Sequence, residues 1–143
     1  MDPTIRIHKQ RVFSLVSAGI IFFAMMLPWI VVNYGGIGNL GGGRLSYNGF
    51  ELRSFLTFIG LLGVVITSLS GDKTSRLKKN LKLIAGISFC IVLAGTLIVL
   101  WEVKGNKEGF GIKPGIGLWL SILAGVTGLL LVLKSFKKAS LRK

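Results

Sequence analysis

Four apolar runs of 18 to 21 residues constrain the fold of this chain more than any other feature of its sequence. They cover residues 12–32, 52–69, 83–101 and 115–133, and the one charged residue within them is Arg53, at the start of the second run. A helix rises about 1.5 Å per residue, so 21 helical residues match the roughly 30 Å hydrocarbon core of a bilayer. The runs therefore predict an all-α integral membrane protein, a four-helix bundle that forms a single domain over residues 1–143.

The distribution of basic residues predicts the orientation of this bundle. The N-terminal segment, the central loop 70–82 and the C-terminal tail together hold 13 of the 18 lysines and arginines, and the outer segments hold five. Cytoplasmic segments of membrane proteins carry an excess of Lys and Arg. We therefore expect both termini and loop 70–82 in the cytoplasm, in a membrane of the bacterial plasma-membrane type, with loops 33–51 and 102–114 outside.

Glycine dominates the first outer loop, which holds seven glycines between Gly35 and Gly49. Glycine lowers helix propensity by about 1 kcal/mol relative to alanine, so the segment is predicted to be an extended loop or a short hairpin, with Asn48-Gly49 as a possible turn. The loop contains a G-x-G-x-x-G pattern from Gly36 to Gly41. It lacks the preceding strand, following helix and distant acid of a dinucleotide site, so we interpret it as a chance match.

Ionisable side chains are missing from the middle of every predicted span. Such residues mark proton relays, ion pathways and catalytic centres in membranes. The single histidine, His8, and the single cysteine, Cys90, form no metal-ligand or nucleophile pattern. We predict a protein that is not an enzyme, without catalytic, cofactor or metal residues. The net charge of +13 lies mainly at the ends of apolar runs, which argues against nucleic acid as a partner.

Three groups of residues are predicted to have structural or membrane roles. Small residues on helix faces allow close helix packing, and tryptophans favour the membrane interface, here the outer one. Basic residues on the inner side either set the topology or hold anionic lipid head groups. The packing residues are Gly60, Gly63, Gly86, Gly95, Ser121, Gly125 and Gly128; the interface anchors are Trp29, Trp101 and Trp119; the inner basic residues are Lys73, Arg76, Lys78, Lys79, Lys82, Lys137 and Lys138.

The order of segments resembles that of four-span (tetraspan) membrane proteins. Leu27-Pro28-Trp29 resembles the Pro/Trp-containing exit of the first span in claudin-like proteins, although the first outer loop lacks their G-L-W motif and cysteine pair. Together with the Asn48-Gly49-Phe50 loop end and the Gly117-Leu118-Trp119 start of the last span, it is also similar to small uncharacterised bacterial four-helix membrane proteins. The resemblance implies a fold and no activity.

These features favour a non-enzymatic interaction protein, a small subunit or accessory factor of a membrane complex. Its partners are membrane lipids and either other membrane proteins or further copies of itself. The alternatives are an oligomeric channel or carrier for a small neutral or lipid-like substrate, and a claudin-like self-assembling element. The residues predicted to contact a partner are the exposed apolar and aromatic side chains of the outer loops: Tyr34, Leu45, Tyr47, Phe50 and Phe110.

Overall fold

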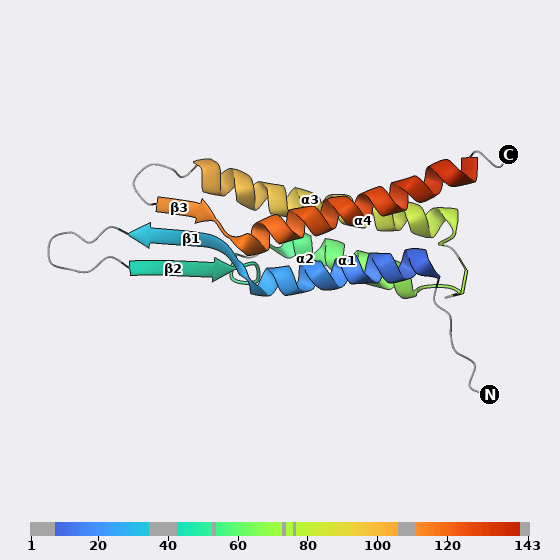
Figure 1. Cartoon of the computed structure of the whole chain (residues 1–143), viewed down its shortest axis with the longest axis horizontal. Coiled ribbons are helices and arrows are strands. Elements are labelled where there is room, and N and C mark those ends of the chain that lie inside the picture. Colours follow the sequence, from blue (N-terminus) through green and yellow to red (C-terminus); the bar gives the residue numbers. More distant parts are fainter. Residues whose placement is uncertain are drawn as a thin grey trace, which may run out of the picture.

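A computed structural model describes residues 8–34, 43–52, 54–72, 74–75, 77–105 and 111–140. It contains four helices and a three-stranded sheet that extends from one end of the bundle (Figure 1). The elements in chain order are α1 (Lys9–Met26), β1 (Pro28–Tyr34), β2 (Gly43–Asn48), α2 (Phe55–Leu69), α3 (Lys79–Gly105), β3 (Gly111–Pro114) and α4 (Ile116–Ser140). The prediction of a mostly helical chain with four helices is confirmed, and the prediction that it is entirely α-helical is wrong.

The first predicted span, residues 12–32, is where the sequence prediction departs most from the structure. Helix α1 ends at Met26, and residues 28–34 form strand β1 instead of continuing the helix. Pro28 forces the preceding residue out of the helical region, and Leu27 is extended at φ −81° and ψ 160°. The β-branched run Ile30-Val31-Val32 then favours a strand.

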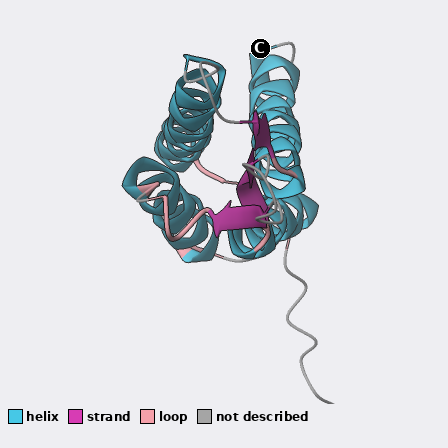
Figure 2. Ribbon diagram, turned by 90° about the vertical axis from the view of Figure 1, so that its left-hand side faces the viewer, coloured by secondary structure: helices cyan, strands magenta, loops and turns pink. Residues whose placement is uncertain are grey.

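The sheet joins the two outer segments of the chain. Its strand order is β2-β1-β3, and both pairings are antiparallel. Val32 lies opposite Leu45 of β2 and Ile112 of β3, so the first and second outer segments meet on β1. Seen along the bundle axis, the strands lie over one end of the helices (Figure 2).

The helices pack as a ring in which each contacts two neighbours. The most extensive contacts join α2 to α3 and α1 to α4. One core cluster lies in the middle of the bundle around Phe89, and a second lies beneath the sheet around Trp29. All three strands and both core clusters therefore depend on contacts between segments that are far apart in the sequence.

The bundle exposes large apolar side chains and buries several polar ones, which is the reverse of the pattern in a protein that folds in water. Phe23, Phe55 and Ile66 are each more than 60% exposed, whereas Ser14, Ser88 and Thr96 are buried. Three helices, α1, α3 and α4, are long and apolar enough to cross a membrane, and α2 is an apolar helix of 15 residues. Such an exposed apolar surface is what a hydrocarbon environment requires, so the chain is a membrane protein.

Glycines set the distance between neighbouring helices at several points. A Cβ added at Gly60 would lie 2.7 Å from the Ser88 carbonyl oxygen and 2.8 Å from the Val92 nitrogen, both on the α3 backbone. Comparable crowding occurs at Gly63, Gly95, Gly125 and Gly128, whereas a Cβ at Gly86 would meet its nearest atom at 3.9 Å. Ser121 is fully buried, and its hydroxyl has no hydrogen-bond partner among the described residues.

We predict that Gly60→Ala destabilises the bundle, because the new methyl group must push α3 away from α2. The expected loss is about 1–3 kcal/mol, as is typical of overpacking. Gly19→Ala is the matched control, since a Cβ there meets no atom within 4 Å. Thermal unfolding in mild detergent should show a lower midpoint for Gly60→Ala only; equal midpoints for the two variants would contradict the close α2–α3 packing.

Candidate functional site

The candidate site is a groove between one face of the sheet and the end of α3. It lies at the end of the bundle that carries the sheet, which we call the outer end after the predicted orientation; the end that carries loop 70–82 is called the inner end. Its volume is about 350 Å³, and eight residues line it: Ile30, Val32, Tyr47, Glu51, Leu52, Glu102, Val103 and Ile112. They come from all three strands, from the turn that precedes α2 and from α3. The groove therefore exists only where the two outer segments fold together.

Alternation along the strands makes the sheet amphipathic. Side chains on successive strand residues point to opposite faces, and paired residues share a face. Ile30 pairs with Tyr47, and Val32 pairs with both Leu45 and Ile112, which gives one apolar face that borders the groove. The opposite face carries Ser46 and Lys113 beside Val31, and Arg44 beside Asn33.

Trp29 fixes the sheet on the bundle. The register of β1 against β2 shifts between Pro28 and Ile30, which leaves Trp29 as an extra residue at a β-bulge. Its indole is fully buried, and Nε1–H donates a hydrogen bond of 2.8 Å to the Ala24 carbonyl oxygen near the end of α1. A Cβ at Gly49 or Gly117 would lie 2.7 Å from the indole ring, so the ring packs directly on both backbones.

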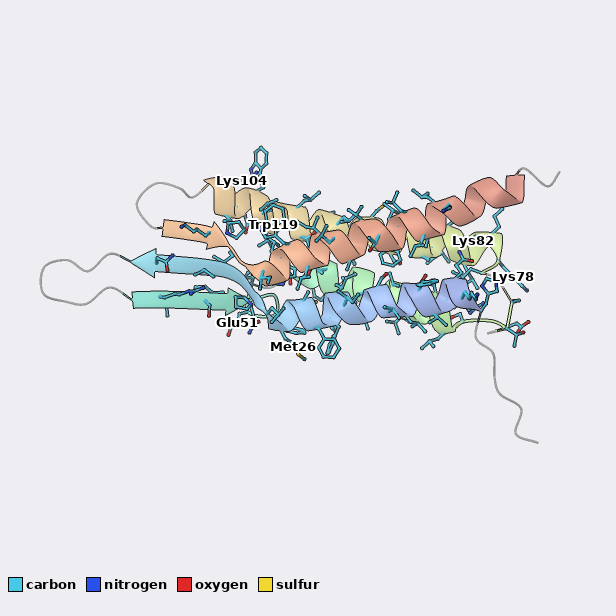
Figure 3. The ribbon with its side chains drawn as sticks, viewed as in Figure 1. Met26, Glu51, Lys78, Lys82, Lys104 and Trp119 are labelled. Atoms are coloured by element: carbon cyan, nitrogen blue, oxygen red, sulfur yellow. The ribbon has the colours of Figure 1, made fainter. Side chains whose placement is uncertain are left out.

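Glu51 is held beside the groove by a capping arrangement in the turn before α2. The Asn48 backbone N–H donates to Glu51 Oε2 at 2.9 Å, and the Asn48 side-chain oxygen accepts from the N–H groups of Phe50 and Glu51 at 3.0 Å. This reciprocal pattern is that of a capping box. Glu51 lies at the base of the sheet in Figure 3. Glu102 comes from the opposite wall, near the end of α3.

The structure separates the residues predicted to contact a partner. Leu45 and Tyr47 are 47% and 40% exposed and share the apolar face of the sheet. Phe50 is exposed elsewhere: its ring contacts Phe22 edge to face, and it lines a separate apolar cleft of about 480 Å³ with Met25, Gly49, Ser54, Phe55 and Phe58. Tyr34 lies at the end of β1, and Phe110 falls outside the described residues.

The three tryptophans have different environments. Trp101 is 81% exposed, and Trp119 is 48% exposed at the outer end of α4 (Figure 3). Trp29 lies in the core instead of at the predicted membrane interface, because its ring fits against two glycines and its N–H finds a backbone partner. Trp29 is therefore a joint between segments, a role that its position in the sequence did not reveal.

At the inner end of the bundle, a buried arginine connects α1 to the end of α2. Arg11 is 1% exposed; its Nη1 donates to the carbonyl oxygens of Ser68 at 2.9 Å and Ser70 at 2.6 Å, and its Nε donates to that of Ser75 at 3.1 Å. A positive charge is stabilising at the C-terminal end of a helix, where backbone carbonyl groups lack helical partners. Hydrogen bonds from Thr74 and Ser75, together with the nearby Arg11 charge, hold the pKa of Asp72 below its ordinary value.

The inner basic residues do not form one uniform surface. Lys78 and Lys79 are exposed, but Lys82 is only 7% exposed, because it lies on the same helical face as the core residues Ala85 and Phe89 (Figure 3). The burial of Lys82 argues against a contact with lipid head groups, and its predicted role in setting the topology stays a prediction. Lys137 and Lys138 lie in the last turns of α4, and Lys73 and Arg76 fall outside the described residues.

No family model matches the chain, and no curated protein is significantly similar to it in sequence. Among the described residues, no three His, Cys, Asp or Glu side chains lie close enough to hold a metal ion. The absence of an enzymatic activity and of a cofactor stays a prediction. The groove and the sheet face beside it are thus the features from which a function must be argued.

We predict that Trp29→Phe destabilises the protein by roughly 2 kcal/mol, because it removes the hydrogen bond to Ala24 and leaves space beneath the sheet. Trp101→Phe is the matched control, since Trp101 is largely exposed. Thermal unfolding in detergent measures both changes. An unchanged midpoint for Trp29→Phe would contradict the role of Trp29 as the joint between sheet and bundle.

Proposed function

We propose that the chain is a non-enzymatic integral membrane protein that binds a partner protein through its outer sheet, as a small subunit or accessory factor of a membrane complex. The observation that carries the proposal is the apolar face of the sheet, which includes the exposed side chains of Leu45 and Tyr47. The sheet extends from one end of the bundle (Figure 1). Exposed apolar residues next to a groove are typical of interaction sites.

In this proposal all four helices cross the membrane, with both termini in the cytoplasm. Helix α2 spans only about 22 Å, but it lies between α1 and α3, and the turn of residues 49–52 adds to its outer end. Membranes thin locally around short spans at a modest cost. The excess of basic residues at the inner end supports the orientation, which places the sheet outside the cell.

A second candidate, a carrier for a lipid-like substrate, is favoured by the apolar cleft beside Phe50. Its lining offers one hydroxyl, that of Ser54, which donates its hydrogen bond to the Gly49 carbonyl oxygen. Nothing in the lining distinguishes a substrate from an ordinary acyl chain of the bilayer. The cleft therefore indicates contact with membrane lipid and gives no specific support for transport of a substrate. For this reason we rank the carrier second.

The proposal predicts a stoichiometric partner protein when the tagged chain is extracted from its own membrane in mild detergent and analysed by mass spectrometry. Leu45→Ser/Tyr47→Ser should reduce the recovered partner about tenfold or more, because two apolar contacts are lost. Arg44→Ser, on the opposite face of the same strand, is the control and should retain the partner.

Recovery of the chain alone, as a monomer, would contradict the proposal. Recovery of a homo-oligomer without another protein would favour the self-assembling alternative. An unchanged amount of partner with Leu45→Ser/Tyr47→Ser, in a variant that elutes like the unaltered protein, would show that the partner does not bind at the sheet.

A further inference from the structure

The groove beside the sheet combines apolar walls with two carboxylates. Ile30, Val32 and Ile112 line the sheet side, and Leu52 and Val103 line the helix side. Glu51 and Glu102 are both exposed and both belong to the lining. The cavity, at about 350 Å³, is large enough for one long side chain and its neighbours.

This concentration of negative charge is unusual in a chain with a net charge of +13. The described residues include three acids: Glu51, Glu102 and Asp72. Asp72 lies in the loop at the inner end, so both described acids of the outer end line the same groove. Charge in the groove therefore has the opposite sign to the chain as a whole.

The described basic residues of the outer end are Arg44, Lys113 and Lys104. Arg44 and Lys113 occupy the opposite face of the sheet. Lys104 lies at the end of α3, two residues after Glu102, and on the far side of the bundle end from Glu51 in Figure 3. Among the described residues, neither glutamate forms an ion pair. The two carboxylates of the groove thus have no ion-pair partner within the described part of the chain.

We infer that the groove binds a segment of the partner protein that carries a lysine or arginine flanked by apolar side chains. The inference rests on the proposed function and names the chemistry of the partner. A lysine or arginine places its aliphatic stem along an apolar surface and its charge at the polar end. The stem would lie along the Ile30, Val32 and Ile112 wall, and the charged group would reach Glu51 and Glu102.

Charge complementarity selects this occupant over a purely apolar one. An apolar segment would cover two carboxylates without compensating them, which costs free energy. Tyr47, which also lines the groove, adds an aromatic side chain, and this also favours a cation. The sheet face supplies contact area, and the two glutamates supply specificity and orientation.

The test uses the purified full chain in phosphatidylcholine nanodiscs and the peptide Leu-Lys-Leu-Arg-Leu-amide with fluorescein on its N-terminal amine, measured by fluorescence anisotropy. We expect saturable binding that weakens about fivefold for each carboxylate removed in Glu51→Gln and Glu102→Gln, as for partly exposed charge pairs. Glutamine can still accept the Asn48 hydrogen bond, so Glu51→Gln preserves the turn. Asp72→Asn, at the other end of the bundle, should bind like the unaltered protein.

Equal binding by the unaltered protein and by Glu51→Gln/Glu102→Gln would overturn the inference, provided that the thermal midpoints match. Equal binding of a peptide in which glutamines replace the lysine and arginine would overturn it too, as would binding to empty nanodiscs at the same level. Loss of a homo-oligomer in the double variant would identify a second copy as the occupant and would also overturn it.

Recovery of the partner from membranes separates this inference from the proposed function. If Glu51→Gln/Glu102→Gln retains the full amount of a partner that Leu45→Ser/Tyr47→Ser loses, the charge recognition is wrong and the proposed function stands. If the unaltered protein brings down no partner at all, the proposed function itself is wrong. A parallel loss of partner and peptide in the double variant supports both.

Discussion

The arrangement of the outer end depends on the packing of the buried Trp29 side chain. Its indole fills the space where α1, the turn before α2 and the start of α4 converge, and its N–H binds the α1 carbonyl of Ala24. Backbone hydrogen bonds add to this joint: Gly49 donates to Met25 at 2.8 Å, and Gly115 donates to Trp29 at 2.7 Å. The sheet is therefore fixed to the helices by side-chain and backbone contacts at one point, and the groove between them has a defined shape.

The interior of the bundle is polar where it approaches the inner surface. Arg11 is buried there, and the acids among the described residues are all exposed, so it donates hydrogen bonds to three backbone carbonyls instead. In hydrocarbon, backbone carbonyls that lose their helical partner need another donor, so Arg11 stabilises the end of α2 and the following loop. The two ends of the molecule are thus stabilised in a similar way. At each end a large side chain, Arg11 of α1 or Trp29 just after it, donates hydrogen bonds to backbone carbonyls.

The sequence was sufficient to predict the parts of the fold that depend on hydrophobicity along the chain. Long apolar runs identified the four helices, because the length and composition of a helix are local properties. The sheet was not predicted, because Ile30, Val31 and Val32 are as apolar as the helix before them, and their pairing with Leu45 and Ile112 joins distant segments. The groove depends on that pairing, so the sequence named Tyr47 as a contact residue but could not bring Glu51 and Glu102 to the same site.

The most direct test of this account is the side of the membrane on which the sheet lies. The chain has one cysteine, so Ser46→Cys on β2 and Asn80→Cys at the start of α3 can each be made as the single cysteine in a Cys90→Ser background. A membrane-impermeant maleimide applied to intact cells should label Ser46→Cys, and it should label Asn80→Cys only after the cells are permeabilised. Labelling of Asn80→Cys in intact cells, with Ser46→Cys protected, would show that the orientation is the reverse of the proposed one. It would contradict a partner-binding sheet outside the cell.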